Sequence, residues 1–126
     1  MKPEERIHFN LADYTKLQYP TVFFISESSG VRTSIGLATK LKRTRSAHTH
    51  VDIYFLEPVG KYSGLFLELK DGKDKIFKKN GDYKTEHVEN QADTIEKLNK
   101  KGYYATFAWS FDMAKEILDD YLHGNL

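Results

Sequence analysis

Two β-type segments separated by one short turn constrain the fold of this chain more than any other feature. Residues 51–56 and 62–70 are rich in β-branched, aromatic and aliphatic side chains, and residues 57–61 between them contain Pro58 and Gly60. In the second segment Leu65, Leu67 and Leu69 alternate with other residues, which is the period of a strand with one face in the core. The pattern therefore predicts an antiparallel hairpin at the centre of the fold.

Helical segments are predicted on both sides of this hairpin. The first covers residues 3–18, because Pro3 suits the first turn of a helix and Pro20 prevents continuation. Thr85 predicts the cap of a second helix, which runs to residue 101 and ends at Gly102. Asp112 predicts the cap of a last helix, which ends at residue 124.

The order of these elements predicts the fold class. Shorter β-type runs at residues 22–25 and 103–109 complete the series helix, strand, hairpin, helix, strand, helix. This order predicts an α/β fold with a small mixed β-sheet flanked by helices. A chain of 126 residues buries one core, so we expect a single domain over residues 1–126. Residues 26–47 contain no pattern that favours a helix over a loop.

The amino-acid composition excludes several kinds of site and of binding. The sequence has no cysteine, which excludes a disulfide framework, a thiolate zinc site and a cysteine nucleophile. Its first residues do not form a signal peptide, and no apolar run approaches a membrane span, so we expect an intracellular protein without a membrane partner. Nineteen basic and 18 acidic residues give a net charge of +1, which argues against nucleic-acid binding through bulk charge.

Asp52, Glu68 and Lys70 form the most informative polar group. Side chains alternate along a strand, so Glu68 and Lys70 share a face, and the hairpin brings Asp52 beside Glu68. Two neighbouring carboxylates repel each other unless a cation lies between them, and such oxygen ligands suit Mg²⁺ or Mn²⁺. A lysine beside that pair orients water or stabilises charge on a phosphate, so the group suits metal-assisted phosphodiester hydrolysis.

These residues also have a structural interpretation. A Glu-x-Lys pair on an exposed strand is usually solvated charge, and a short motif alone is weak evidence. Gln91 shares the apolar face of the predicted second helix. There it either contacts the carboxylates or lies at the edge of that face and meets solvent. Taken alone, Gln91 favours contact with solvent.

The sequence resembles a known family over roughly residues 4–122. The matching series resembles the VRR-NUC domain, the virus-type replication-repair nuclease branch of the PD-(D/E)XK superfamily, in its stand-alone phage and bacterial form. It consists of Tyr19-Pro20, Val51-Asp52-Ile53, the segment 62–70 with its Gly64-Leu65 and Glu68-Leu69-Lys70, then Gln91, and the end of the second helix at Gly102-Tyr103.

The resemblance implies a restriction-endonuclease-like PD-(D/E)XK core that cuts DNA with Mg²⁺ or Mn²⁺. It implies that Asp52 and Glu68 are metal ligands, that Lys70 is the catalytic lysine, and that Gln91 is the family's helix glutamine, which completes the catalytic group.

Two regions depart from the family pattern or match it less clearly. The family's first helix often supplies a glutamate ligand, for which Glu5 is the best match and Glu4 the second. His8 stands where a helix glutamine is common. The family's Gly-x-Pro-Asp turn is replaced by residues 49–52, which end in the aspartate but lack the proline; the loss affects the approach of this loop to DNA rather than the metal chemistry.

The histidines before Asp52 leave a second metal chemistry open. His48-x-His50-x-Asp52 is similar to the first ligand run of metallo-β-lactamase-like hydrolases, but that fold needs further histidines and a longer chain. His50 is instead expected at the rim of the carboxylate site, where it contacts phosphate or a metal ligand.

Basic residues flank the predicted site in sequence. One cluster, before Asp52, contains no acid and is expected to contact DNA; its members, with the neighbouring histidine, are Lys40, Lys42, Arg43, Arg45 and His50. A second, from residue 70 to residue 84, has six lysines and three aspartates. It either tracks a DNA backbone or is a solvated loop, and the sequence does not separate these two interpretations.

These observations favour a divalent-metal-dependent DNA endonuclease, with branched, flap or four-way junction DNA as the substrate that the resemblance implies. A four-way junction has two-fold symmetry, so a homodimer would fit it. The alternative is an inactive nuclease fold that binds nucleic acid or protein, or a regulatory subunit of a larger complex.

Overall fold

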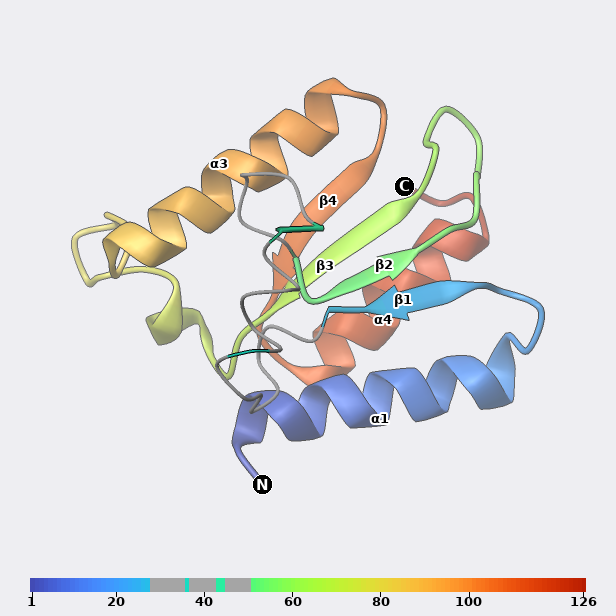
Figure 1. Ribbon diagram of the computed structural model, residues 1–126, viewed down its shortest axis with the longest axis horizontal. Helices are drawn as coiled ribbons and strands as arrows, with labels where there is room; N and C mark the ends of the chain where they lie inside the picture. The colour runs from blue at the N-terminus through green and yellow to red at the C-terminus, as the bar shows by residue number, and fades with distance from the viewer. Residues whose placement is uncertain (28–35, 37–42, 45–50) are drawn as a thin grey trace.

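A computed structural model describes residues 1–27, 36, 43–44 and 51–126 of the chain. Within these residues it contains three α-helices, one short 3₁₀-helix and four strands (Figure 1). In chain order they are α1 (Pro3–Gln18), β1 (Phe24–Ser26), β2 (Ile53–Phe55), β3 (Leu65–Leu69), the 3₁₀-helix η1 (Lys73–Lys75), α3 (Glu86–Lys100), β4 (Tyr104–Ala108) and α4 (Phe111–Leu122).

The four strands form one mixed sheet in the order β1-β2-β3-β4. β1, β2 and β3 are antiparallel neighbours, and Ile53 of β2 lies opposite Leu67 of β3. β3 and β4 run parallel, with Glu68 opposite Phe107. A parallel pair needs a long crossover connection, and α3 supplies it. The sheet thus has the mixed character and the central hairpin that the sequence predicts.

Helices α1 and α4 cover one face of the sheet with a continuous apolar core. Leu65, Leu67 and Leu69 of β3 point into this core and are almost fully buried. Ile7 and Leu11 of α1 meet them there, together with three buried residues of α4: Ala114, Leu118 and Tyr121. In Figure 1 α4 lies behind the sheet and α1 runs along its β1 side. Burial of these apolar side chains is the main favourable term for this half of the fold.

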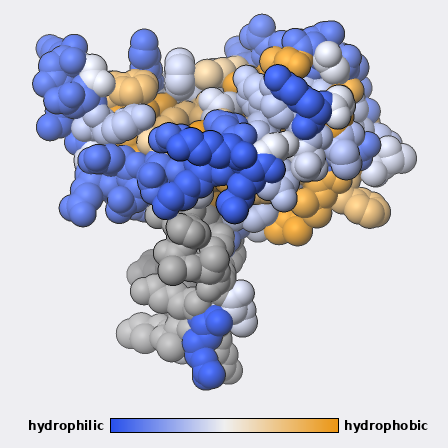
Figure 2. Space-filling view, turned by 90° about the horizontal axis from the view of Figure 1, so that it is seen from above, coloured by the Kyte–Doolittle hydropathy of each residue, from blue (hydrophilic) through white to orange (hydrophobic). Residues whose placement is uncertain are grey.

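Helix α3 covers part of the opposite face with a smaller apolar cluster. Ile95 of this helix packs with Val51 and with Ala105 of β4. The outer side of α3 is charged, and Lys97 pairs with Asp93 at 2.9 Å. Hydrophilic residues accordingly dominate the face seen from the α3 side (Figure 2). The smaller cluster leaves room on this face for polar residues.

The predicted helices agree with the structure more closely than the predicted strands, since 51–56 and 62–70 shorten to Ile53–Phe55 and Leu65–Leu69. α1 covers the predicted residues, and the Thr85 hydroxyl caps α3 by accepting a hydrogen bond from the Val88 N–H at 3.2 Å. The predicted cap of α4 is wrong: Ser110, not Asp112, caps it, accepting from the Met113 N–H at 3.0 Å. Both residues are good caps, and the extended backbone of Ser110 decides between them.

The strand predicted at residues 22–25 begins two residues later, at Phe24. It is limited to the three residues that pair with β2. Most of residues 26–47 lie outside the described part of the chain. No helix in the described residues is long and apolar enough to span a lipid bilayer.

Candidate active site

The candidate site lies on the α3 side of the sheet, at the end of β3. Glu68 alternates with the core-facing Leu67 and Leu69, so its side chain leaves the strand toward α3. Lys70 follows on the same face. Only 3% of Glu68 and 8% of Lys70 is exposed, and the Lys70 Nζ lies 4.0 Å from the Glu68 Oε1. The pair is therefore buried, which excludes the solvated-charge interpretation.

Asp52 precedes β2 and joins this group, as the sequence predicts. Its Oδ2 accepts a hydrogen bond from the backbone N–H of Leu69 at 2.7 Å, which fixes the carboxylate against the end of β3. The antiparallel register places Ile53 opposite Leu67, so the residue before Ile53 meets the residue after Leu67. Asp52 and Glu68 are thereby neighbours.

Gln91 of α3 contacts the carboxylate group directly. Its Nε2 donates a hydrogen bond to the Glu68 Oε1 at 2.6 Å, and only 5% of the residue is exposed. Of the two interpretations that the sequence leaves open for Gln91, the structure has the contact with the carboxylates and not the one with solvent. Periodicity places Gln91 on the inner face of the helix, but only the tertiary packing places that face over Glu68.

Two polar atoms of this group have no hydrogen-bond partner among the described residues. They are the Glu68 Oε2 and the Gln91 Oε1, and both are buried. A buried polar atom without a partner costs about 1–3 kcal/mol, and more when it is charged. The missing partner of an ionised Glu68 Oε2 is a hydrogen-bond donor or a cation, whereas a protonated Glu68 can donate from this atom to Asp52.

Burial strongly raises the pKa of Glu68, to about 9. The negative charge of Asp52 acts in the same direction, whereas the positive charge of Lys70 opposes it. Without a cation, the folded protein therefore holds a protonated Glu68 at neutral pH. A carboxyl group with a strongly shifted pKa beside a second carboxylate and a lysine is typical of functional sites.

The two glutamates predicted as ligands lie in the first turn of α1. The charge of Glu4 contributes to the raised pKa of Glu68, whereas Glu5 is the less exposed of the two. The sequence prefers Glu5 as a metal ligand, and the ligand role of either residue stays a prediction.

Sequence reasoning missed one pair at the edge of the site. His8 lies one helical turn after Glu4, and its Nε2 is 2.9 Å from the Ser26 Oγ at the end of β1. Burial lowers the pKa of His8, and the charge of Asp52 partly offsets this effect. The i, i+4 spacing of Glu4 and His8 places both on one side of α1 and is the signal that could have linked them.

The predicted DNA-binding cluster is almost entirely outside the described residues. Only Arg43 of this cluster is described, as an exposed residue of helical conformation. Lys40, Lys42, Arg45 and His50 are not described, nor is His48, so their contact with DNA stays a prediction.

The donor set fits a divalent cation that brings some of its own ligands. No group of three or more Asp, Glu and His side chains in the described part of the chain is arranged to hold a metal ion. Asp52 and the unpartnered Glu68 Oε2 provide two anionic oxygens. Mg²⁺ is commonly held by one or two carboxylates, with water and substrate phosphate completing its octahedron, so two suffice.

The comparisons with known proteins bear on the fold. No protein-family model and no curated protein matches the sequence. Among solved structures, one similar chain is named "VRR_NUC domain protein". It shares 21% sequence identity with this chain at a TM-score of 0.70, and the match covers 98% of this chain and 90% of that one.

The chain thus has the fold of a VRR-NUC domain protein, as the sequence resemblance implies. This is an α/β fold with a mixed four-stranded sheet. At 21% identity the likeness concerns the fold, and the roles of the site residues stay predictions.

Proposed function

We propose that this protein is a divalent-metal-dependent DNA endonuclease that hydrolyses phosphodiester bonds at the site formed by Asp52, Glu68 and Lys70. The nuclease-type fold supports this proposal. The position of all three residues at one end of β3 supports it further, because the sequence motif and the folded arrangement agree.

One observation carries the proposal: the Glu68 carboxyl group is buried next to a second carboxylate and keeps one oxygen without a partner. A structural role alone does not account for this, since an apolar side chain of the same size is more stable at such a position. A cation between Asp52 and Glu68 would satisfy the free oxygen and allow both carboxylates to ionise.

Each residue of the site would then have a separate role in the reaction. Asp52 and Glu68 would hold Mg²⁺ or Mn²⁺, with Glu4 or Glu5 as a further candidate ligand. When bound, the metal supplies positive charge that polarises the phosphate and lowers the pKa of water. Lys70 would orient the attacking water or stabilise negative charge on the phosphate. Gln91 holds the Glu68 Oε1, and this contact fixes the direction of the carboxylate.

The proposal also includes the structure of the DNA that the enzyme prefers. Branched substrates, including flaps and four-way junctions, follow from the VRR-NUC resemblance. A homodimer would match the two-fold symmetry of a four-way junction.

A panel of labelled single-stranded, duplex, flap and four-way junction DNAs tests the activity, with Mn²⁺, with Mg²⁺ and with chelator. We expect cleavage only with metal, and more on branched DNA than on the matched duplex. Asp52→Ala and Lys70→Ala should reduce the rate by at least about 10³-fold, since each removes a group that acts on the reacting phosphate.

The control is Asp112→Ala, which removes an exposed carboxylate in the first turn of α4, the helix on the other face of the sheet. It should cut at the parent rate. Cleavage by Asp52→Ala at the parent rate would show that the activity resides elsewhere, and metal-independent cleavage would exclude the proposed chemistry.

One observation favours an inactive nuclease fold that binds nucleic acid or protein: no group of three metal-binding side chains occurs in the described residues. Titration calorimetry with Mn²⁺ separates the two functions. A nuclease should bind Mn²⁺ in a manner that Asp52→Ala abolishes, whereas an inactive binding domain need not bind Mn²⁺ at all.

A further inference from the structure

Residues 73–84 follow the candidate site and form a small hairpin that begins with η1. The Lys78 N–H donates to the Asp82 carbonyl at 2.7 Å, and the Gly81 N–H donates to the Lys78 carbonyl at 3.0 Å. Gly81 has a φ of +91°, which suits the last position of a three-residue hairpin loop. A side-chain turn between Asn80 and Asp82 closes the tip. The segment is therefore folded and is not a solvated coil.

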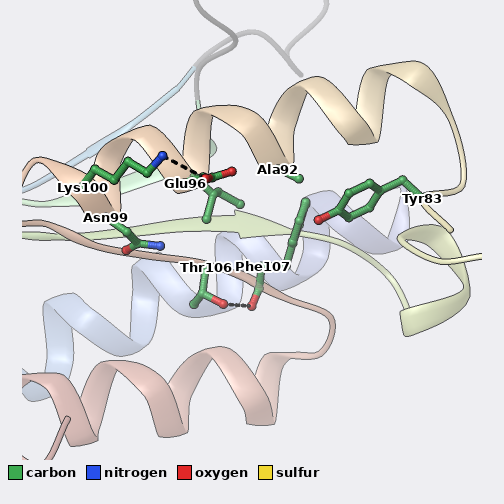
Figure 3. Close-up of a pocket in the computed structure, with 8 residues that line it drawn as sticks. Tyr83, Ala92, Glu96, Asn99, Lys100, Thr106 and Phe107 are labelled. Atoms are coloured by element: carbon green, nitrogen blue, oxygen red, sulfur yellow. Dashed lines mark hydrogen bonds and ion pairs between the residues drawn. The ribbon is translucent and has the colours of Figure 1, made fainter. Parts of the chain in front are cut away.

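This hairpin is anchored to the body of the domain. Ile76 at its base is fully buried, and its carbonyl accepts from the Lys84 N–H at 2.7 Å. The rings of Phe77 and Tyr83 stack across it with centroids 5.6 Å apart. Tyr83 points into the pocket between α3 and β4, toward Phe107 (Figure 3). These contacts fix the orientation of the hairpin relative to β3 and α3.

The lysine side chains of the segment are exposed and form no ion pair with the described residues. Residues 73–84 contain five lysines and two aspartates, an excess of three positive charges. The lysines are all exposed and form no ion pair within the described residues; they are Lys73, Lys75, Lys78, Lys79 and Lys84. On α3, by contrast, Lys97 and Lys100 are each paired with an acid one turn away. The hairpin therefore presents cationic groups that are available to an anionic ligand.

The hairpin also lies between the two elements that form the candidate site. It begins three residues after Lys70, a separation of at most about 11 Å along the chain. It ends at Thr85, the cap of the helix that carries Gln91. The segment is therefore within reach of a DNA backbone that has a phosphate at Glu68 and Lys70.

We propose that residues 73–84 bind the phosphate backbone of the substrate DNA on one side of the cleaved bond. This inference rests on the proposed function and adds a second DNA contact to it. Lysines bind phosphate as flexible point charges and carry no base readout, so the contact would set position and affinity without sequence preference. Because the hairpin is preformed, little ordering of the backbone opposes binding.

Fluorescence anisotropy with a labelled junction and a labelled duplex tests the proposal. The measurement is made in chelator, so that no cleavage occurs, at salt concentrations from 50 to 200 mM. Each lost phosphate contact lowers the slope of log K against log salt by about 0.9 for duplex DNA. Lys78→Ala/Lys79→Ala should lower it by up to about 1.8 and reduce affinity about tenfold at 100 mM salt.

The matched control is Lys16→Ala/Lys61→Ala, which removes the same charge from the end of α1 and from the β2–β3 turn. It should keep the parent slope. A second pair, Lys73→Ala/Lys84→Ala, should behave as Lys78→Ala/Lys79→Ala does. All six lysines in these three double variants are exposed, so each variant should unfold at the temperature of the parent protein.

Equal slopes for the hairpin variants and the control would overturn the inference, even if the protein cuts DNA. A hairpin-dependent slope in a protein that does not cut DNA with Mn²⁺ would support the inference and refute the nuclease activity. Absence of any DNA binding by the parent protein would refute both.

Discussion

Two carboxylates on opposite sides of the sheet have opposite environments. Asp119 of α4 is surrounded by donors: the hydroxyl groups of Tyr14 and Tyr19 each donate to its Oδ1 at 2.6 Å, and the Lys115 Nζ donates to its Oδ2 at 3.1 Å. Glu68 of β3 has one donor on Oε1 and none on Oε2 among the described residues.

The pKa values of the two groups differ accordingly. Burial acts to raise the pKa of Asp119, but its hydrogen bonds outweigh burial and hold the pKa below its usual value. Burial raises the pKa of Glu68 to about 9, and the nearby Asp52 adds to the effect. The fold thus satisfies the carboxylate that joins α1 to α4 and leaves the one at the candidate site unsatisfied. This is the difference expected between a structural carboxylate and one at a functional site.

The largest expected effect concerns the missing partner of Glu68. Mn²⁺ at 100 times its dissociation constant should stabilise the folded protein by about 2.7 kcal/mol, because the Asp52 carboxylate and the Glu68 Oε2 would be its ligands. Thermal unfolding with and without Mn²⁺ measures the shift. Asp52→Asn should lose it and Asp112→Asn should retain it. An equal shift in Asp52→Asn would show that the ion binds elsewhere. The difference between Glu68 and Asp119 would then not mark a metal site.

Replacement of the Glu68 carboxyl group should have the next largest effect. Glu68→Gln should raise the free energy of unfolding at pH 8 without metal by about 1–3 kcal/mol, because the parent must take up a proton on folding at this pH and the amide need not. The same variant should abolish metal-dependent cleavage. A loss of stability in chemical denaturation would mean that the Glu68 carboxylate is satisfied in solution.

The stability of the folded protein should depend on pH, because the pKa of Glu68 is higher in the folded than in the unfolded state. Between the unfolded pKa of about 4.5 and the folded pKa of about 9, the folded protein retains a proton that the unfolded chain releases. The stability of the parent should therefore fall as the pH rises through this window, by at most about 1.4 kcal/mol per unit. Glu68→Gln should lack this slope when both proteins are unfolded with urea from pH 5 to pH 9.

The grouping of Asp52, Glu68 and Lys70 could be predicted from the sequence. The alternation of Leu65, Leu67 and Leu69 has the period of a strand and fixes which side chains face the core. That period also places Glu68 and Lys70 together, and a turn of five residues brings Asp52 beside them. Local patterns suffice here because the contacts join neighbouring strands.

The contacts of α1 and α3 could not be predicted in the same way. Gln91 and Glu68 are 23 residues apart, and helical periodicity shows which face is inward without showing what lies under it. The choice between Glu4 and Glu5 likewise depends on the rotation of α1 over the sheet. Asp112 and Ser110 are equally good caps by residue type, and backbone conformation selects one of them.

A smaller effect is expected from the residue that holds Glu68. Gln91→Met keeps the size of the side chain but removes the hydrogen bond to the Glu68 Oε1. Loss of such a supporting contact typically reduces metal affinity by about tenfold or more. Calorimetric titration with Mn²⁺ should show this reduction, while thermal stability without metal changes little. A parent-like affinity would show that Gln91 does not position the carboxylate.

The satisfied carboxylate should give the smallest effect and the opposite sign. Asp119→Asn weakens three hydrogen bonds to a charged acceptor, and because Asp119 is partly exposed we expect a loss of about 1 kcal/mol at pH 7. The folded pKa of Asp119 lies below the unfolded value of 3.8, so its contribution is present above pH 3.8 and disappears as the pH falls through the folded pKa. The parent and Asp119→Asn should therefore converge in stability in acid and differ at neutral pH, with equal DNA cleavage per folded molecule. If Asp119→Asn stabilised the protein as Glu68→Gln should, the two carboxylates would be equivalent, and the shortage of donors at Glu68 would no longer mark a site.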